Sequence, residues 1–284
     1  MDDSKPPVQS GYDPAWLELV RGTCLYVATI LGDYMVDDLA VVGGLVPRLL
    51  IDHDRLPEGA DPHPGTRDLD LGLSLALLEE EKYREIAARL RDAGFLPDTS
   101  KKGNPTLQRW RYVSERGEEV LVDFLIPPSQ PDDGPGSLLH IEGDFAAIVT
   151  PGLELAFRDR ETISLGGRTI RGEVCERPIG VCGPGAYVVL KALAFRSRGS
   201  PKDAFDLYYV VRNYGGGVED VAARLTTLRD APEAQEALTI LEKDFGAPDS
   251  LGPMRVAEFM GISDDAGLRE DVVGFVRRLL ELCS

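Results

Sequence analysis

The chain has 284 residues, of which 48 are acidic and 31 are basic, so its formal net charge is −17. A surface this acidic repels nucleic-acid phosphates on average, which argues against a general nucleic-acid binder unless basic residues gather locally. The same charge favours cationic substrates or a basic protein partner.

The cysteines and the apolar segments indicate the compartment. Four cysteines show neither metal-ligand spacing nor a disulfide framework, which is typical of free thiols in a reducing compartment. The N-terminus lacks the basic and apolar regions of a signal peptide. No apolar run approaches the ~20 residues of a membrane span. We therefore expect a cytoplasmic protein with no membrane partner.

The chain begins with a segment expected to be a flexible arm, residues 1–11, which is polar and contains prolines. Asp13-Pro14 predicts a helix start, because a cap residue precedes proline at the first helical position. A strand is predicted over 39–42, and Gly43-Gly44 ends it. A short helix is expected to follow, through about Leu50.

The glycine pair allows two interpretations. A Gly-Gly sequence after a strand is usually a tight turn into the next helix. Alternatively, the backbone at Gly43 and Gly44 approaches a triphosphate closely, and Arg48 reaches the same phosphates. The segment 52–65 is rich in Pro, Gly and Asp and predicts an exposed loop. Its histidines, His53 and His63, are expected to be exposed.

Two carboxylates lie on the next predicted strand, which follows Thr66 and covers Asp68 to Leu73. Because side chains alternate along a strand, Asp68 and Asp70 point to the same face. Neighbouring carboxylates repel each other unless a cation lies between them. Oxygen ligands of this kind suit Mg²⁺, which binds one or two carboxylates together with substrate phosphates. The pattern predicts a metal-dependent nucleotide-transfer site.

A third carboxylate lies in a predicted hairpin made of 108–113 and 119–126. Asp123 interrupts an apolar run typical of a strand buried on both faces. A carboxylate there must be paired, hydrogen-bonded or bound to metal. Taken alone, an ion pair with a neighbour is the simpler explanation. After Asp68 and Asp70, we favour a third metal ligand.

The same hairpin and the turn before it carry the densest basic patch of the first half, namely Lys101, Lys102, Arg109 and Arg111. This patch would either contact RNA phosphates or remain a solvated face.

Before this hairpin, the pattern over 79–93 predicts an amphipathic helix. The segment 127–138, rich in Pro and Gly, predicts an irregular internal linker. Short strands over 145–180 would extend the sheet.

The remainder of the chain has a helical pattern. The predicted helices cover 186–196, 201–213, 218–228, 232–245 and 268–282. Lys191 stands on an apolar helix and must either reach the surface or meet an anion. Arg198, seven residues on, shares its face and would line a phosphate path with it. Asp203 fits the first turn of the next helix, whereas Asp206 would orient Lys191 or activate an acceptor hydroxyl.

Together these motifs resemble the polymerase-β-type nucleotidyltransferases. The helix pair around Lys191 and the sequence Lys-Asp-Ala-Phe-Asp-Leu at 202–207 is similar to the AbiEii-type toxins of type IV toxin–antitoxin and abortive-infection systems. The resemblance covers 39–210, and the last seventy residues match nothing specific. It implies an α+β fold, with a nucleotidyltransferase domain over 12–180 and a mostly helical domain over 181–284.

The resemblance also implies roles for single residues. Asp68 and Asp70 would hold Mg²⁺, joined by Asp123 as a third carboxylate. Lys191 and Asp206 would be catalytic, arriving from the second domain. The nucleotide would contact the remaining candidates, which are Gly43, Gly44, Arg48, Thr66 and Arg198. The second glycine replaces a serine of many relatives, so a hydroxyl contact to phosphate is lost.

The expected reaction transfers a nucleoside monophosphate from an NTP to an acceptor such as the tRNA 3′ end. A cognate antitoxin would then be a protein partner. Two alternatives stay open. One is a nucleotidyltransferase that inactivates aminoglycoside-type antibiotics, whose cationic substrates suit an acidic surface. The other is a non-catalytic module that binds a nucleotide or a partner, although such a module has no physical reason to keep Asp68 and Asp70 together.

Overall fold

The computed structural model describes residues 8–56, 60–74, 80–100, 103–114, 117–130, 132–143 and 145–284. Residues 1–7 of the expected arm, and Lys101 and Lys102 of the basic patch, lie outside these ranges. The chain divides into two compact units. The sheet unit contains Ala15–Leu45 and Thr66–Cys182, and the helical unit contains 8–14, Val46–Gly65 and Gly183–Ser284.

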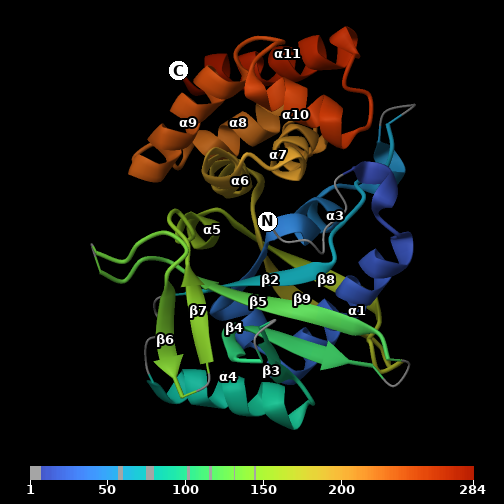
Figure 1. The fold of residues 1–284 in the computed structure, drawn as a ribbon, viewed down its shortest axis with the longest axis vertical. Coiled ribbons are helices and arrows are strands. Elements are labelled where there is room, and N and C mark those ends of the chain that lie inside the picture. The colour runs from blue at the N-terminus through green and yellow to red at the C-terminus, as the bar shows by residue number, and fades with distance from the viewer. Residues whose placement is uncertain are drawn as a thin grey trace. The chain divides into compact units, whose positions relative to one another are not determined.

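The sheet unit is built on a mixed sheet (Figure 1). Its strands are β1 (Leu39–Val42), β2 (Asp68–Leu73), β3 (Leu96–Thr99), β4 (Pro105–Val113), β5 (Glu119–Ile126), β6 (Leu138–Glu142), β7 (Phe145–Val149), β8 (Arg160–Arg168) and β9 (Val174–Cys182). Their order is β3-β4-β5-β2-β1-β9-β8, and β7 pairs with both β5 and β6. The helices are α1 (Pro14–Leu31), α2 (Tyr34–Asp37), α4 (Glu80–Asp92) and α5 (Leu155–Arg158).

The two faces of the sheet differ in polarity around β4 and β5. Trp110 and Phe124 lie on one face and both contact the ring of Phe145, with centroids 5.7 and 4.9 Å away. Tyr83 of α4 packs on the same ring from 6.1 Å. All four side chains are fully buried, which makes this face the hydrophobic core. Residues one position along each strand therefore point to the opposite face, and Asp123 is one of them.

The helical unit contains α3 (Val46–Leu50), α6 (Pro184–Arg198), α7 (Pro201–Asn213), α8 (Val218–Thr226), α9 (Pro232–Phe245), α10 (Leu251–Phe259) and α11 (Ala266–Cys283). In Figure 1, α6 to α11 form the region drawn from yellow to red. Helix α10 was not among the predicted helices, and its first turn contains Gly252-Pro253, a pair that is unfavourable in a helix interior. Proline is tolerated in a first helical turn, since the N–H that it lacks has no partner within the helix.

The expected α+β architecture is confirmed: a mixed sheet with flanking helices precedes a helical region. The predicted hairpin is also confirmed, because β4 and β5 pair antiparallel. In the predicted linker 127–138, the described residues 127–130 and 132–137 contain no helix or strand, as expected, whereas Leu138 begins β6; these residues lie inside the sheet unit. Within the described ranges, every helix is too short or too polar to cross a membrane.

Candidate functional site

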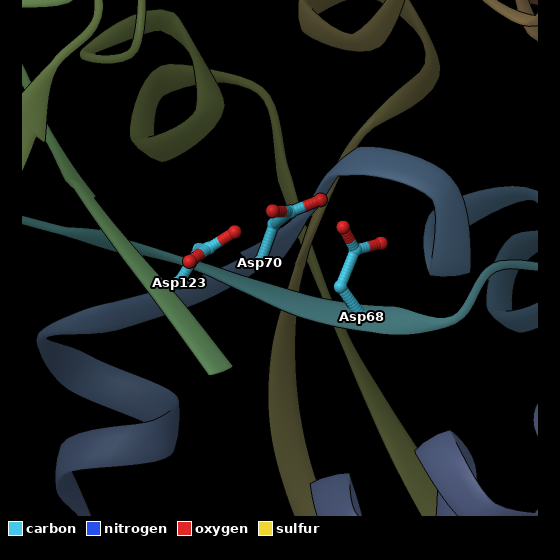
Figure 2. Close-up of side chains that lie close together, drawn as sticks. All are labelled: Asp68, Asp70 and Asp123. Atoms are coloured by element: carbon cyan, nitrogen blue, oxygen red, sulfur yellow. The ribbon is translucent and has the colours of Figure 1, made fainter. Parts of the chain in front are cut away.

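Three aspartates converge on the polar face of the sheet (Figure 2). Asp68 and Asp70 stand two residues apart on β2, and Asp123 of the parallel neighbour β5 lies in register with Asp70. Each can offer one carboxylate oxygen such that the three oxygens lie within 4.8 Å of one another. Asp68 and Asp123 are buried, and Asp70 is half-buried. The period-2 prediction for β2 and the placement of Asp123 beside it are therefore confirmed.

A glycine turn lies directly against Asp70. Gly43 follows Val42, the antiparallel partner of Asp70 on β1, and has a φ of +70°. A Cβ atom at this position would lie 1.9 Å from Oδ2 of Asp70. Glycine is required here for two reasons: the backbone is in the left-handed conformation, and the carboxylate of Asp70 occupies the space where a Cβ atom would lie. Gly43 and the buried Gly44 then form a 3-10 turn that runs to Leu45.

Thr66 fixes the first aspartate. Its Oγ1 donates a hydrogen bond to Oδ1 of Asp68 at 2.5 Å, and both side chains are buried. Thr66 thus holds the rotamer of a candidate metal ligand. Its neighbour Arg67 stacks over the ring of Trp16, with its Cζ 3.8 Å from the ring centroid.

Asp123 also forms an ion pair, and sequence reasoning did not identify its partner. Arg109 of β4 lies directly opposite Asp123 in the β4–β5 register. Its Nε and one terminal nitrogen donate to Oδ1 and Oδ2 of Asp123, each at 2.7 Å. The ion pair considered for Asp123 is therefore present, and the residue also belongs to the acidic cluster.

The donor set fits a hard divalent cation. The three side chains of the cluster offer carboxylate oxygens, which suit Mg²⁺ and Mn²⁺ better than softer metals. The space left by the absent Cβ of Gly43 lets Asp70 take its position in the cluster. Asp68 and Asp70 would hold such an ion, with Asp123 as the third carboxylate.

The other predicted catalytic residues, Lys191 and Asp206, form a network in the helical unit. Nζ of Lys191, on α6, donates to Oδ1 of Asp203 at 3.1 Å and to Oδ2 of Asp206 at 2.7 Å. Arg198 donates two hydrogen bonds to Asp203, from Nε to Oδ2 at 2.5 Å and from a terminal nitrogen to Oδ1 at 2.8 Å. Nζ of Lys202 donates to both oxygens of Asp206, at 2.7 and 3.0 Å. The basic residues expected to line a phosphate path thus bind the two aspartates of α7.

His63 joins this network, which corrects the expectation of an exposed histidine. Its side chain is buried, and Nε2 lies 2.9 Å from Oδ1 of Asp206. The backbone N–H of Gly65 donates to Nδ1, so the proton of a neutral ring is on Nε2 and points to Asp206. Phe205 stacks on the ring and Tyr209 packs edge-on against it. The expectation of exposure failed for His63 because its partner Asp206 lies on a helix remote in sequence.

Charge and burial oppose each other within the network. Burial lowers the pKa of His63 to about 4, despite the opposing hydrogen bond to Asp206. Burial alone would raise the pKa of Asp206, but Lys191 and Lys202 outweigh it and hold that pKa well below the ordinary value. Burial alone would lower the pKa of Lys191, but Asp206 and Asp203 outweigh it and raise that pKa. Asp206 is therefore a poor proton acceptor at neutral pH.

The predicted site residues fall into two groups. Gly43, Gly44, Thr66 and the three aspartates lie in the sheet unit, whereas Lys191, Arg198, Asp206 and Arg48 lie in the helical unit. Arg48 donates to the carbonyl oxygen of His63 at 3.4 Å. The sequence could have indicated that Arg109 pairs with Asp123. The two positions are equally distant from position 116, the centre of the predicted hairpin, so they lie opposite each other on its two strands.

Comparison with known proteins adds little. No protein-family model matches the chain, and no curated protein matches its sequence. Among solved structures, the chain is similar to the crystal structure of an antigenic nucleotidyltransferase-like protein from Paracoccidioides brasiliensis. The two share 16% identity with a TM-score of 0.41, over 84% of this chain and 90% of that one. A TM-score below 0.5 does not establish a common fold, so the chemistry of the site rests on its own residues.

Proposed function

We propose that the protein is a Mg²⁺-dependent nucleotidyltransferase. One observation carries the proposal: three aspartates from two adjacent parallel strands converge on one face of the sheet, with the turn at Gly43 packed against one of them. In the reaction, an acceptor hydroxyl oxygen bonds to the α-phosphorus of an NTP. The bond from that phosphorus to the bridging oxygen breaks, pyrophosphate leaves, and the hydroxyl proton passes to solvent or base.

The residues of the sheet unit supply position and charge. Asp68, held by Thr66, and Asp70, placed beside Gly43, present oxygens on one face of β2. A bound Mg²⁺ would neutralise phosphate charge and lower the pKa of the attacking hydroxyl. Backbone amides of the turn at Gly43 and Gly44 would approach the triphosphate, as the absence of side chains there permits.

The role of the helical unit follows from its network. The resemblance to the AbiEii-type toxins implies catalytic roles for Lys191 and Asp206. Because Asp206 accepts hydrogen bonds from Lys191, Lys202 and His63, we expect it to position Lys191 and not to remove a proton. Lys191 would then contribute a fixed positive charge.

For the acceptor, the same resemblance favours the tRNA 3′ end and a toxin whose cognate antitoxin is a protein partner. The net charge of −17 favours instead a cationic acceptor such as an aminoglycoside. A small neighbouring gene that encodes a winged-helix regulator would support the toxin assignment.

One labelling experiment tests these proposals together. The protein is incubated with Mg²⁺, each α-labelled NTP in turn, and either total tRNA or an aminoglycoside. Asp70→Ala is the test variant, and Asp92→Ala, an exposed aspartate of α4, is its matched control. Label in tRNA that Asp70→Ala abolishes and Asp92→Ala retains supports the toxin. Label only in the aminoglycoside overturns the tRNA assignment. No label, together with no nucleotide binding by calorimetry, would favour a non-catalytic module that binds a partner.

A further inference from the structure

Both ring nitrogens of His63 have defined roles. Nδ1 accepts a hydrogen bond from the backbone N–H of Gly65 at 3.1 Å, so the proton of the neutral ring lies on Nε2. Nε2 donates to Oδ1 of Asp206 at 2.9 Å, and both side chains are fully buried. The rings of Phe205 and Tyr209 pack against the imidazole, with centroids 5.6 and 4.9 Å away. The imidazole is therefore held in one orientation.

Asp206 also accepts hydrogen bonds from two lysines. Nζ of Lys191 donates to Oδ2 at 2.7 Å, and Nζ of Lys202 donates to both oxygens. Lys202 belongs to the same helix as Asp206, whereas His63 reaches it from the segment Val46–Gly65. The last torsion of an aspartate has no sharp preference, so its carboxylate needs a fixed donor to keep one orientation. With Oδ1 held by His63, Oδ2 faces Lys191.

The backbone of His63 contacts another residue that is expected to meet the nucleotide. Arg48, on α3, donates from a terminal nitrogen to the carbonyl oxygen of His63 at 3.4 Å. His63 therefore contacts Arg48 directly and Lys191 through Asp206. Both basic residues are candidates for the phosphates of an NTP, whereas the sequence pattern predicted His63 as an exposed loop residue without a function.

We infer that His63 is a positioning residue of the proposed nucleotidyl transfer, which orients the carboxylate of Asp206 so that Lys191 keeps its place. The inference rests on the proposed function, in which Lys191 supplies a fixed positive charge. A charge that is already in place stabilises the transition state without reorganisation, so loss of His63 should lower kcat more than it changes KM for the NTP. Burial lowers the pKa of His63 to about 4, so the ring is neutral at neutral pH and serves as a hydrogen-bond donor.

The test measures nucleotidyl transfer by the full chain with the acceptor that the wild type labels. His63→Phe keeps an aromatic ring and removes the donor, so kcat should fall about 10- to 100-fold, the effect of a misplaced catalytic group, while KM for the NTP stays within about threefold. His63→Gln places an amide N–H near the position of Nε2 and should recover most of kcat. His53→Phe is the matched control, because His53 stacks on the same Tyr209 ring from 6.3 Å, and it should keep the wild-type kcat.

Two further measurements separate positioning from folding. Urea unfolding gives the folded fraction of each variant, and kcat is calculated per folded chain. His63→Phe is also combined with Lys191→Met. If His63 acts through Lys191, the double variant should have the kcat of Lys191→Met within about twofold.

Nitrogen-15 spectra of the wild-type imidazole test the same hydrogen bond without a substitution, and they decide the matter if His63→Phe does not fold. The signals of His63 are those that disappear in His63→Gln. A proton on Nε2 and none on Nδ1 at neutral pH support the inference. A proton on Nδ1 of the neutral ring overturns it, because Nε2 could then not donate to Asp206.

The kinetic outcomes separate the inference from the proposed function. No transfer by the wild type removes the proposed function and the inference with it. Transfer by the wild type with an equal kcat for His63→Phe overturns the inference alone. Equal losses of kcat in His63→Phe and His53→Phe also overturn it, because the loss would then follow from the packing around Tyr209. A further large loss when His63→Phe is added to Lys191→Met overturns the path through Lys191.

Discussion

His63 and Asp206, which are 143 positions apart in the sequence, are joined by a buried hydrogen bond of 2.9 Å. The bond connects the segment Val46–Gly65 to helix α7 inside the helical unit. Since Nδ1 accepts a hydrogen bond from the N–H of Gly65, the neutral ring carries its proton on Nε2 and donates it to Asp206, whereas protonation of Nδ1 would remove the acceptor for Gly65. The attachment of this segment therefore depends on the protonation state of one ring.

Removal of the imidazole should destabilise the helical unit. We expect His63→Ala to lower the free energy of unfolding by about 1–3 kcal/mol, because Asp206 loses a buried donor. The packing against Phe205 and Tyr209 is lost as well. Urea denaturation followed by circular dichroism measures the change. His140→Ala, which removes an exposed histidine of β6, is the control. Equal midpoints for the two variants would show that the buried bond contributes nothing.

The same histidine should make stability depend on pH. Its pKa in the folded protein is about 4, below the ordinary value of 6.5, so the unfolded chain binds the proton more tightly. The stabilisation is complete above pH 6.5, decreases as the pH falls, and is lost by about pH 4. The loss is on the order of 3 kcal/mol. Urea midpoints of wild type and His63→Gln at pH 7 and 4.5 measure it. A wild-type decrease no larger than that of the variant contradicts the assignment.

Substitution of the turn glycine should disable the acidic cluster. Gly43→Ala adds a Cβ where Oδ2 of Asp70 lies, so Asp70 must move and the Mn²⁺ affinity should fall more than about tenfold. Gly136→Ala is a matched control, since Gly136 has a φ of +76° and nothing within 4 Å of the added atom. Both variants place an alanine in the left-handed conformation, which costs about 1–2 kcal/mol, whereas only Gly43→Ala displaces a candidate metal ligand. Equal Mn²⁺ affinities in the two would refute the close approach.

Loss of the buried lysine should be costly. Lys191→Met leaves Asp203 and Asp206 in the interior with fewer partners, and breaking such a pair costs about 3–5 kcal/mol. Because Lys202 and His63 still contact Asp206, we expect the lower end of that range. Thermal unfolding is compared with that of Lys243→Met, an exposed lysine of α9. If Lys191→Met is as stable as Lys243→Met, the network is not what holds this region together.

The acidic cluster was accessible from the sequence because its geometry is local. Asp68 and Asp70 are two residues apart on a strand, so their side chains share one face. Asp123 was recognisable because it is a charged residue within an apolar run. The ion pair with Arg109 could also have been found, since a symmetrical hairpin sets the two residues opposite each other. Only the turn at its centre had to be placed correctly.

The environment of His63 could not be predicted in the same way. Its segment has the composition of an exposed loop, and its burial results from Phe205, Tyr209 and Asp206 on a helix remote in sequence. No local pattern encodes that contact. Helix α10 was missed for a different reason. The pair Gly252-Pro253 has a composition typical of a helix break, but it lies in the first turn of the helix, where proline is tolerated.

The close approach of Gly43 to Asp70 affects how inactive copies of this gene would be recognised. Any other amino acid at position 43 adds a Cβ atom. One substitution there can therefore displace Asp70 while all three aspartates of the cluster remain in the sequence. A homologue can therefore keep all three acids and still have lost the site. In a comparison of homologues, position 43 should therefore be inspected together with the three aspartates.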